Sequence, residues 1–299
     1  MDEITYFLSQ LFNGLKLGSV YAMVAIGYSM VYGILKLINF AHGDIMTVGV
    51  YTILVLMTAF GMPLWACIII SILIAIAVGL IAERAAYRPL RTAGEETILV
   101  SSLAVSIILQ NLLILIFSPQ RKAFQLPDAL SALHSFGSVK LSTMNIITFA
   151  SVFVILIVLS YVIKYTRIGL AMRACSDNMN ASKLMGINIT TVIVAAFAIG
   201  SSLAALSGLM LAGEYKTIDP LMGFVPGLKA FCAAVLGGIG SLSGAVLGGF
   251  ILGVAEMLFA GLMPTEYTAY RDAFVFVLLI VVLLIRPNGI LGTKDGGRS

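Results

Sequence analysis

The sequence predicts an all-α, polytopic helical integral membrane protein with about eight or nine membrane segments. Of its 299 residues, 60% are hydrophobic and only 11% are charged, whereas a typical soluble domain has about 25% charged residues. The apolar residues also come in runs of about twenty, the length that a helix needs to cross a bilayer. No second soluble domain stands out, so residues 1–299 are expected to form a single transmembrane domain.

Apolar segments follow one another along the chain and define the expected helices. They lie at 8–35, 42–60, 64–82, 97–117, 145–163, 191–212, 228–260 and 272–286. The segment 228–260 is too long for one simple span, and a glycine-rich stretch that can break a helix occupies its middle. We therefore expect a helical hairpin or a broken, re-entrant pair, with the break around Gly237, Gly238, Gly240 and Ser241, which are candidates for a pathway or gate. Irregular backbone at membrane depth requires burial in protein or a cavity to line.

Basic residues assign the loops to sides of the membrane, because Lys and Arg accumulate in cytoplasmic loops. Loop 83–96 contains Arg84, Arg88 and Arg91, and loop 164–190 contains Lys164, Arg167, Arg173 and Lys183. Both loops are therefore expected in the cytosol, together with the C-terminal tail that carries Arg286, Lys294 and Arg298. Loop 118–144 then lies outside, and segment 228–260 leaves and returns on the same face.

The loop 164–190 contains a short helix with its own start and stop signals. Ser176 or Asp177 can cap its beginning, and Gly186 can end it. The helix would present an apolar surface to the cytosol through Met179, Ala181, Leu184 and Met185. Such a surface between two spans indicates a soluble partner.

Small residues recur at intervals of four in several segments. Ala196, Gly200, Ala204, Gly208 and Ala212 follow one another along one helix, and Gly14/Gly18, Gly240/Gly244 and Gly249/Gly253 form further pairs. Small residues allow helix backbones to approach closely in lipid. Three interpretations of these small residues remain open: packing within this chain, a subunit interface and a pore lining.

A polar cluster, Asn39, His42 and Asp44, lies at the start of the second apolar segment. One interpretation is an interfacial turn in which Asn39 caps the following helix and Asp44 favours its positive end. The other is that these residues shape an inner mouth, pathway or gate, or contact an ATPase.

Charged residues near segment 228–260 also have two interpretations each. Glu256 lies within the span, where an ionisable group faces protein or water, so it either makes a structural hydrogen bond or acts in translocation. Asp219 and Lys229 flank the outer end, either in a solvated loop or against an extracytoplasmic partner.

Several classes of function find no support in the sequence. The net charge of +4 is small, and the basic residues lie beside the spans. This distribution does not indicate nucleic-acid binding. No phosphate-binding Gly-x-x-x-x-Gly-Lys-Ser/Thr loop is present, and no catalytic constellation or metal-ligand spacing is evident. We expect no cofactor on this chain, and any ATP and Mg²⁺ would bind a partner chain.

Three stretches together resemble the LivH-type permease subunits of bacterial branched-chain amino acid ABC importers. They are Gly18–Ala22 continuing to Ile38–Asp44, the loop Ala181–Ile187, and Lys229–Ser241. ABC importers in general carry Glu-Ala-Ala in a coupling loop, followed by Gly after three residues. Asn180, Ala181 and Ser182 precede Gly186 at that spacing, so the glutamate of the motif is missing here.

The resemblance implies a permease in the bacterial cytoplasmic membrane. Such a chain is not an enzyme, because it moves its substrate without changing it chemically. It implies four kinds of partner: a second, LivM-like permease, two ABC ATPase subunits, an extracytoplasmic substrate-binding protein, and leucine, isoleucine or valine as substrate. The coupling residues would be Asn180, Ala181, Ser182, Leu184, Met185 and Gly186. A permease for urea, short amides or other amino acids remains an alternative, as does an autonomous secondary transporter or channel.

Overall fold

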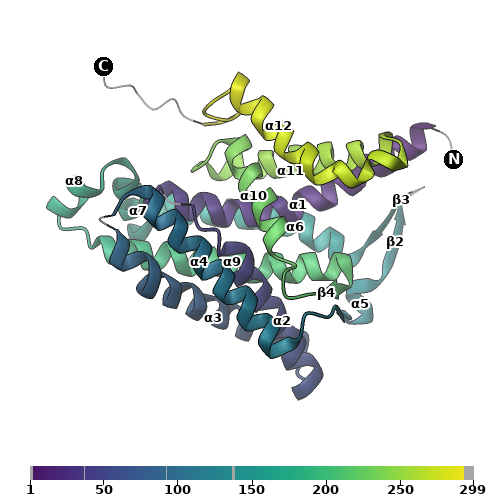
Figure 1. Ribbon diagram of the computed structural model, residues 1–299, viewed down its shortest axis with the longest axis horizontal. Coiled ribbons are helices and arrows are strands. Elements are labelled where there is room, and N and C mark those ends of the chain that lie inside the picture. The colour runs from purple at the N-terminus through teal and green to yellow at the C-terminus, as the bar shows by residue number, and fades with distance from the viewer. Residues whose placement is uncertain (1–2, 37, 92, 137–138, 293–299) are drawn as a thin grey trace. The chain divides into compact units, whose positions relative to one another are not determined.

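Long helices account for most of the chain (Figure 1). The computed structural model describes residues 3–36, 38–91, 93–136 and 139–292, so Lys294 and Arg298 of the tail lie outside the described residues. The long helices are α1 (Glu3–Leu35), α2 (His42–Phe60), α3 (Leu64–Ala82), α4 (Glu95–Phe117), α6 (Thr143–Tyr165), α9 (Ile189–Tyr215), α10 (Phe224–Gly237), α11 (Leu242–Leu262) and α12 (Arg271–Ile285).

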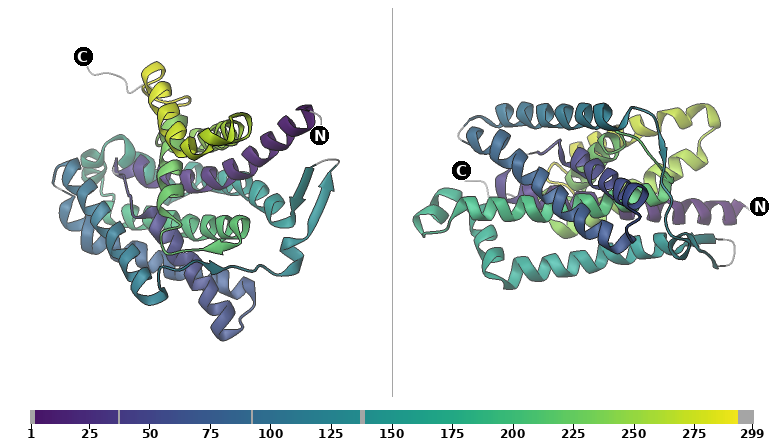
Figure 2. Two further views of the ribbon diagram at one scale, coloured as in Figure 1. Left: turned by 45° about the vertical axis from the view of Figure 1, so that its right-hand side comes forward. Right: turned by 90° about the horizontal axis from the view of Figure 1, so that it is seen from below.

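Short elements connect these helices. They are η1 (Glu83–Tyr87), η2 (Arg88–Leu90), β1 (Lys122–Ala123), α5 (Asp128–Ser131), β2 (Leu133–Phe136), β3 (Val139–Ser142), α7 (Arg167–Asp177), α8 (Met179–Leu184), β4 (Thr217–Ile218) and η3 (Thr265–Tyr270). The strands pair as two short antiparallel ribbons, β1 with β4 and β2 with β3. The two further views in Figure 2 show how small these ribbons are beside the helices.

The predicted membrane segments are confirmed. Among the described residues, eight helices are long and apolar enough to cross a membrane, and α10 is a shorter apolar helix. Seven of the eight predicted apolar segments each match one helix to within about five residues at either end, and segment 228–260 corresponds to α10 and α11. The apolar runs therefore identify the helices correctly, because only a helix satisfies all backbone polar groups within one segment in lipid.

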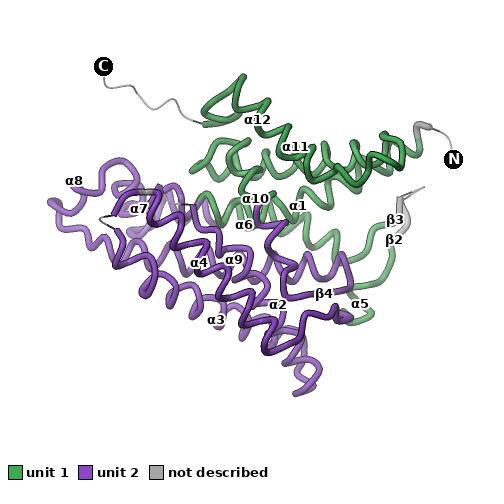
Figure 3. The backbone as a smooth tube through the Cα atoms, viewed as in Figure 1, with its two compact units in different colours: residues 1–29, 126–156, 229–299 green, residues 30–125, 157–228 purple. Residues whose placement is uncertain are grey.

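The chain divides into two compact units, coloured separately in Figure 3. Unit 1 comprises Met1–Ser29, Leu126–Leu156 and Lys229–Ser299, and unit 2 comprises Met30–Gln125 and Ile157–Leu228. Three of the four boundaries fall within α1, α6 and α10, and the fourth, between Gln125 and Leu126, lies in the connection between β1 and α5. A single transmembrane domain stays a prediction.

In unit 2, α9 packs against α2 and α3 through small residues. A Cβ atom added to Gly208 would lie 2.7 Å from the carbonyl oxygen of Met46, and one added to Gly49 would lie 3.0 Å from the Cα of Ala205. Gly79 of α3 similarly faces Ser201 of α9. The small residues of α9 thus pack within this chain, which lets the three helices approach at backbone distance.

In unit 1, the glycine pairs of α1 and α11 pack against each other. A Cβ atom added to Gly253 would lie 2.3 Å from the backbone nitrogen of Gly18, and one added to Gly249 would lie 2.5 Å from the Cα of Ala22. Gly14 and Gly18 in turn face the Cα atoms of Val254 and Phe250. The two helices therefore cross in opposite directions with their backbones in contact.

The long segment 228–260 is broken as predicted, between α10 and α11. Gly238 and Gly240 adopt φ angles of 110° and 90°, which favour glycine. Ser241 then caps α11, because its hydroxyl accepts a hydrogen bond from the N–H of Gly244 at 3.1 Å. The break turns the chain back on itself within a few residues.

The two helices that flank the break form a hairpin. A Cβ atom on Gly237 would lie 1.8 Å from the carbonyl oxygen of Gly244, and one on Gly248 would lie 2.0 Å from that of Ala233. The N–H groups of Ile290 and Leu291, beyond α12, donate to the carbonyls of Leu236 and Gly237 at 2.9 and 2.8 Å. These bonds satisfy the otherwise unpaired carbonyls at the end of α10. That α10 is re-entrant stays a prediction.

We predict that Gly253→Ala destabilises the protein by about 1–3 kcal/mol, the usual cost of overpacking, because the new methyl group overlaps the α1 backbone. Gly94→Ala is the matched control, since its Cβ atom would meet nothing within 4 Å. The midpoint of thermal unfolding in detergent can be followed with a thiol-reactive dye, because Cys67, Cys175 and Cys232 are buried. Equal midpoints for the two variants would contradict the close packing.

Candidate functional site

The loop 164–190, predicted to be cytoplasmic, contains two helices, α7 and α8, rather than one. Thr166 caps α7 by accepting from the N–H of Gly169 at 3.1 Å, and Asn178 caps α8 by accepting from the N–H of Ala181 at 2.9 Å. The predicted start at Ser176 or Asp177 is therefore wrong. Asp177 is the last residue of α7, and the Ser176 hydroxyl donates to the carbonyl of Gly33 on α1 instead.

Gly186 ends α8 as predicted. Its φ angle is 81°, its N–H donates to the carbonyl of Lys183, and the N–H of Ile187 donates to that of Ser182 at 3.0 Å. This pair of bonds is the Schellman arrangement, which places a left-handed residue just after a helix. The short helix thus has defined bonds at both ends.

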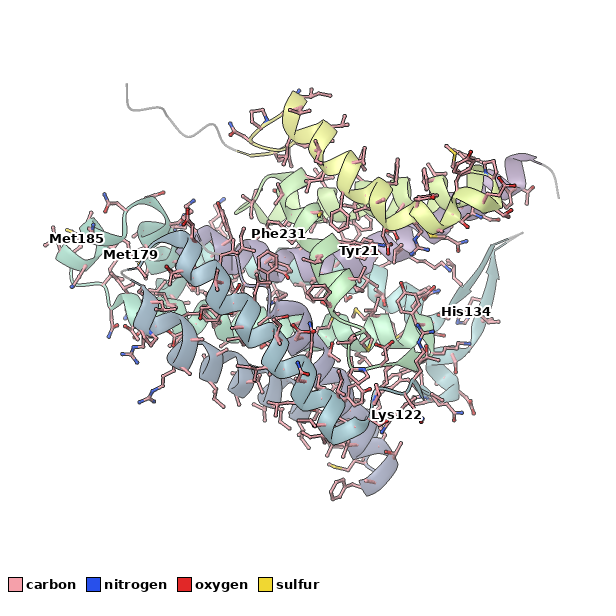
Figure 4. All side chains as sticks on the ribbon, viewed as in Figure 1. Tyr21, Lys122, His134, Met179, Met185 and Phe231 are labelled. Carbon is pink, nitrogen blue, oxygen red and sulfur yellow. The ribbon has the colours of Figure 1, made fainter. Side chains whose placement is uncertain are left out.

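The end of α8 exposes two large apolar side chains side by side. Leu184 is 89% exposed and Met185 is 82% exposed, and Figure 4 shows Met179 and Met185 at the free end of this segment. Asn180, Ala181 and Gly186 are also exposed, whereas Ser182 is buried and donates to the carbonyl of Asn178. Ser182 therefore holds the helix together and is not available on its outer surface.

The preceding helix α7 fixes this tip to unit 2. Met172 and Cys175 are buried in a core cluster with Met30, Ile34 and Val192. Burial raises the pKa of the Cys175 thiol, although a hydrogen bond with Ser182 acts in the opposite direction. One face of the α7–α8 segment is thus anchored in the core, and the other presents apolar groups to solvent.

The polar cluster near residue 40 is buried in unit 2. Asn39 does not cap α2, because Ala41 occupies that position. The side-chain oxygen of Asn39 instead accepts bonds from the N–H of Ala41 at 3.1 Å and from the Tyr87 hydroxyl at 2.7 Å. A buried neighbour from a distant segment outcompetes the local capping geometry that the sequence indicated.

His42 and Asp44 are buried as well. His42 is 2% exposed and Asp44 is fully buried. Asp44 accepts from the Ser106 hydroxyl at 2.5 Å and from the Gln110 amide at 3.1 Å, so it links α2 to α4. Asn39, His42 and Asp44 present no open surface to an ATPase in this structure. Their role in a pathway or gate stays a prediction.

Glu256 is the centre of a buried charge network in unit 1. It is fully buried on α11. It accepts bonds from the Tyr21 hydroxyl at 2.9 Å, from the Lys229 ammonium at 2.6 Å, and from the Arg271 guanidinium. Lys229 also pairs with Asp272 at 2.6 Å. One carboxylate therefore ties α1, α10 and α12 to α11, with two cations balanced by two anions.

The sequence indicated Glu256 but not its partners. Lys229 is 3% exposed, so it belongs neither to a solvated loop nor to an outer docking surface. Asp219, expected beside it, instead pairs with Arg121 at 3.6 Å in unit 2. A basic residue inside the apolar segment 224–237 was the one available signal, because a lone cation there requires an anion from another helix.

Comparison with known proteins shows to which family the sequence is similar. Residues 10–283 match the family model described as branched-chain amino acid transport system / permease component. The chain belongs to this family.

Near relatives cover almost the whole permease. It is 42% identical over 307 residues to the high-affinity branched-chain amino acid transport system permease protein LivH of Salmonella typhimurium, with 98% of each chain covered. It is 43% identical over 308 residues to the corresponding protein BraD of Pseudomonas aeruginosa, with 99% of each chain covered. The chain is therefore a component of a transporter and a multi-pass protein of the cytoplasmic membrane.

A solved structure shares the fold at low sequence identity. It is described as PsaBC from Streptococcus pneumoniae in complex with Fab, with a TM-score of 0.54 and 14% identity over 95% of this permease and 97% of that chain. At this identity the likeness concerns the fold alone.

We predict that Glu256→Ala destabilises the permease by about 3–5 kcal/mol, because removing one partner of a buried ion pair leaves charge without compensation. Glu266→Ala, at an exposed glutamate, is the control. Thermal midpoints in detergent test the difference. A midpoint for Glu256→Ala equal to that of Glu266→Ala would mean that the network does not stabilise unit 1.

We also predict that Leu184→Cys reacts rapidly with a membrane-impermeant maleimide in inside-out vesicles, because this position is almost fully exposed. Ser182→Cys, two residues away and buried, should label slowly. Labelling of Leu184→Cys in right-side-out vesicles but not in inside-out ones would place the segment on the wrong side of the membrane.

Proposed function

We propose that this chain is the permease subunit of an ATP-driven importer that moves leucine, isoleucine and valine across the cytoplasmic membrane. The exposed Leu184–Met185 tip of α8, held by the buried face of α7, carries the proposal. An apolar tip on an anchored base can occupy a groove of a soluble partner without losing its own position. The names of the LivH and BraD relatives support the substrate class.

The proposed complex contains a second, LivM-like permease, two ABC ATPase subunits and an extracytoplasmic binding protein. ATP and Mg²⁺ would bind the ATPase subunits, and this chain would hold no cofactor. Closure of the ATPase pair would displace α8, and the permease halves would alternate between outward and inward states. The chain would supply a path between helices and would break no bond of the substrate.

The mechanism requires that force on α8 reaches the membrane helices. Two features favour this. The α7 side is fixed by Met172 and Cys175 in the core and by the bond from Ser176 to Gly33. On the other side, Gly186 is followed within a few residues by α9, which Asn188 caps by accepting from the N–H of Thr191 at 3.2 Å. Little flexible chain separates the tip from the spans on either side.

We predict that changing both Leu184 and Met185 to Asp abolishes ATP-driven leucine uptake in proteoliposomes and removes the ATPase subunits from a mild-detergent pull-down. Binding would bury the two introduced carboxylates at the interface without partners of opposite charge, and this opposes association. Leu133→Asp, at an apolar residue that is 69% exposed in β2, is the control for the effect of an added surface charge and should keep the ATPase subunits bound.

Uptake of labelled leucine in competition with isoleucine, valine and urea separates the substrates. Competition by urea alone would overturn the proposed substrate class. A chain that purifies alone and transports without ATP, with the double variant fully active, would instead indicate an autonomous transporter or channel.

A further inference from the structure

The corner between α3 and α4 has an irregular backbone. α3 continues into η1, a wide π-type turn, and then into η2, a tight 3₁₀ turn that contains Pro89. Proline lacks the N–H group that would continue an α-helix, and π-type turns within helices frequently occur at functional sites. The corner places Glu83, Tyr87 and Arg91 next to residues from other parts of unit 2.

Arg91 joins this corner to the beginning of α9. Its guanidinium pairs with the Glu83 carboxylate, whose side chain is only 3% exposed. A second nitrogen of the same guanidinium donates to the Thr190 hydroxyl at 3.2 Å. Thr190 lies in the first turn of α9, four positions beyond Gly186, which ends α8. Arg91 therefore binds the membrane helix at the point where the chain leaves the α7–α8 segment.

Tyr87 continues the connection from the corner to α2. It is 3% exposed, and its hydroxyl donates to the Asn39 side chain at 2.7 Å. The centroid of its ring lies 5.4 Å from the ring centroid of Phe197 on α9. Because Asn39 also accepts from the N–H of Ala41, the same tyrosine positions the residues at which α2 starts.

We propose that Arg91 is a positioning residue that transmits displacement of α8 to the α3–α4 corner and, through Tyr87 and Asn39, to the start of α2. This inference rests on the proposed function, because it requires α8 to be moved by an ATPase. It gives a role to Asn39, which the sequence marked as a candidate for a pathway or gate.

The chemistry of Arg91 suits this role. A guanidinium offers several donors in a rigid plane, so it can hold a carboxylate and a hydroxyl at once, whereas a lysine ammonium is a point charge on a flexible stem. Glu83 is buried and fixes one side of the guanidinium, so motion of Thr190 reaches the corner without being taken up by a free side chain.

The position of the contact also matters. Only a few residues lie between Gly186 and Thr190, and Gly186 and Asn188 have non-helical backbone conformations. Without a tie on the first turn of α9, rotation of these residues could absorb a displacement of α8. With Thr190 held by Arg91, the displacement is shared between α9 and the α3–α4 corner.

The test uses the complete transporter in proteoliposomes, with both permeases, the ATPase subunits and the binding protein, and measures leucine transported per ATP hydrolysed. We expect Arg91→Lys and Thr190→Val each to lower this ratio by about threefold or more, within the range by which single residues modulate coupling. The double variant should be no worse than either single variant, because both remove one contact.

Arg84→Lys is the matched control, since Arg84 lies in the same corner but is exposed and should leave the ratio unchanged. Thr190→Val preserves the shape of the side chain and the Glu83–Arg91 pair, so it separates transmission from folding. The variants could instead lose uptake and ATPase activity equally, so that the ratio stays at the wild-type value, with additive losses in the double variant. That result would mean that Arg91 only stabilises the fold, and it would overturn the inference.

The wild-type transporter distinguishes this failure from that of the proposed function. Coupled uptake by the wild type with an unchanged ratio in the variants rejects the role of Arg91 alone. Absence of ATP-driven leucine uptake by the wild type rejects the proposed function and the inference with it.

Discussion

Direct contact between helix backbones is the constraint on which both units depend. Lipid tails are as apolar as leucine, so membrane helices gain little from simple burial and associate through close packing and polar contacts. A Cβ atom added to Gly253, Gly208 or Gly237 would overlap backbone atoms of the neighbouring helix. The atoms that it would meet belong to Gly18, Met46 and Gly244, respectively. Each of these contacts fixes the distance between two helices, and the polar groups between the helices are placed accordingly.

Buried charges follow from this close packing. Once helices approach at backbone distance, an ionisable side chain between them has little access to water and requires hydrogen-bond partners or a partner of opposite charge. Glu256 meets Lys229 and Arg271, and Glu83 meets Arg91. In both clusters the partners come from different helices or turns, so the ion pairs specify which segments lie together. These carboxylates act as ties between segments rather than as open binding groups.

Much of the fold could be predicted from local sequence, because local sequence determines it. Apolar runs gave the spans, and the glycines around residue 238 gave the break, since only glycine readily adopts those φ angles. The exposed tip at Leu184 and Met185 and the stop at Gly186 were likewise visible in the pattern.

What the sequence could not provide were contacts between distant residues. Ser176 and Asp177 both have side chains that can cap a helix, so the sequence predicted that the helix starts there. In the structure Ser176 bonds to Gly33 instead, and Asn178 caps α8. Lys229 looked like a loop residue because its partners Glu256 and Asp272 lie on later helices. Arg91 looked like one of several cytoplasmic arginines, and only the fold distinguishes it from Arg84 by bringing Glu83 and Thr190 to its side chain.

The ties on either side of α8 determine what a force on its tip can do. Towards the N-terminal side, α7 is held by buried side chains and by the bond from Ser176 to α1. Towards the C-terminal side, the first turn of α9 is held by Arg91. A segment tied at both ends cannot move by local unwinding alone, because either tie would have to break. A partner that binds Leu184 and Met185 would therefore act on the C-terminal end of α1 and the N-terminal end of α9 together, and through Arg91 on the α3–α4 corner.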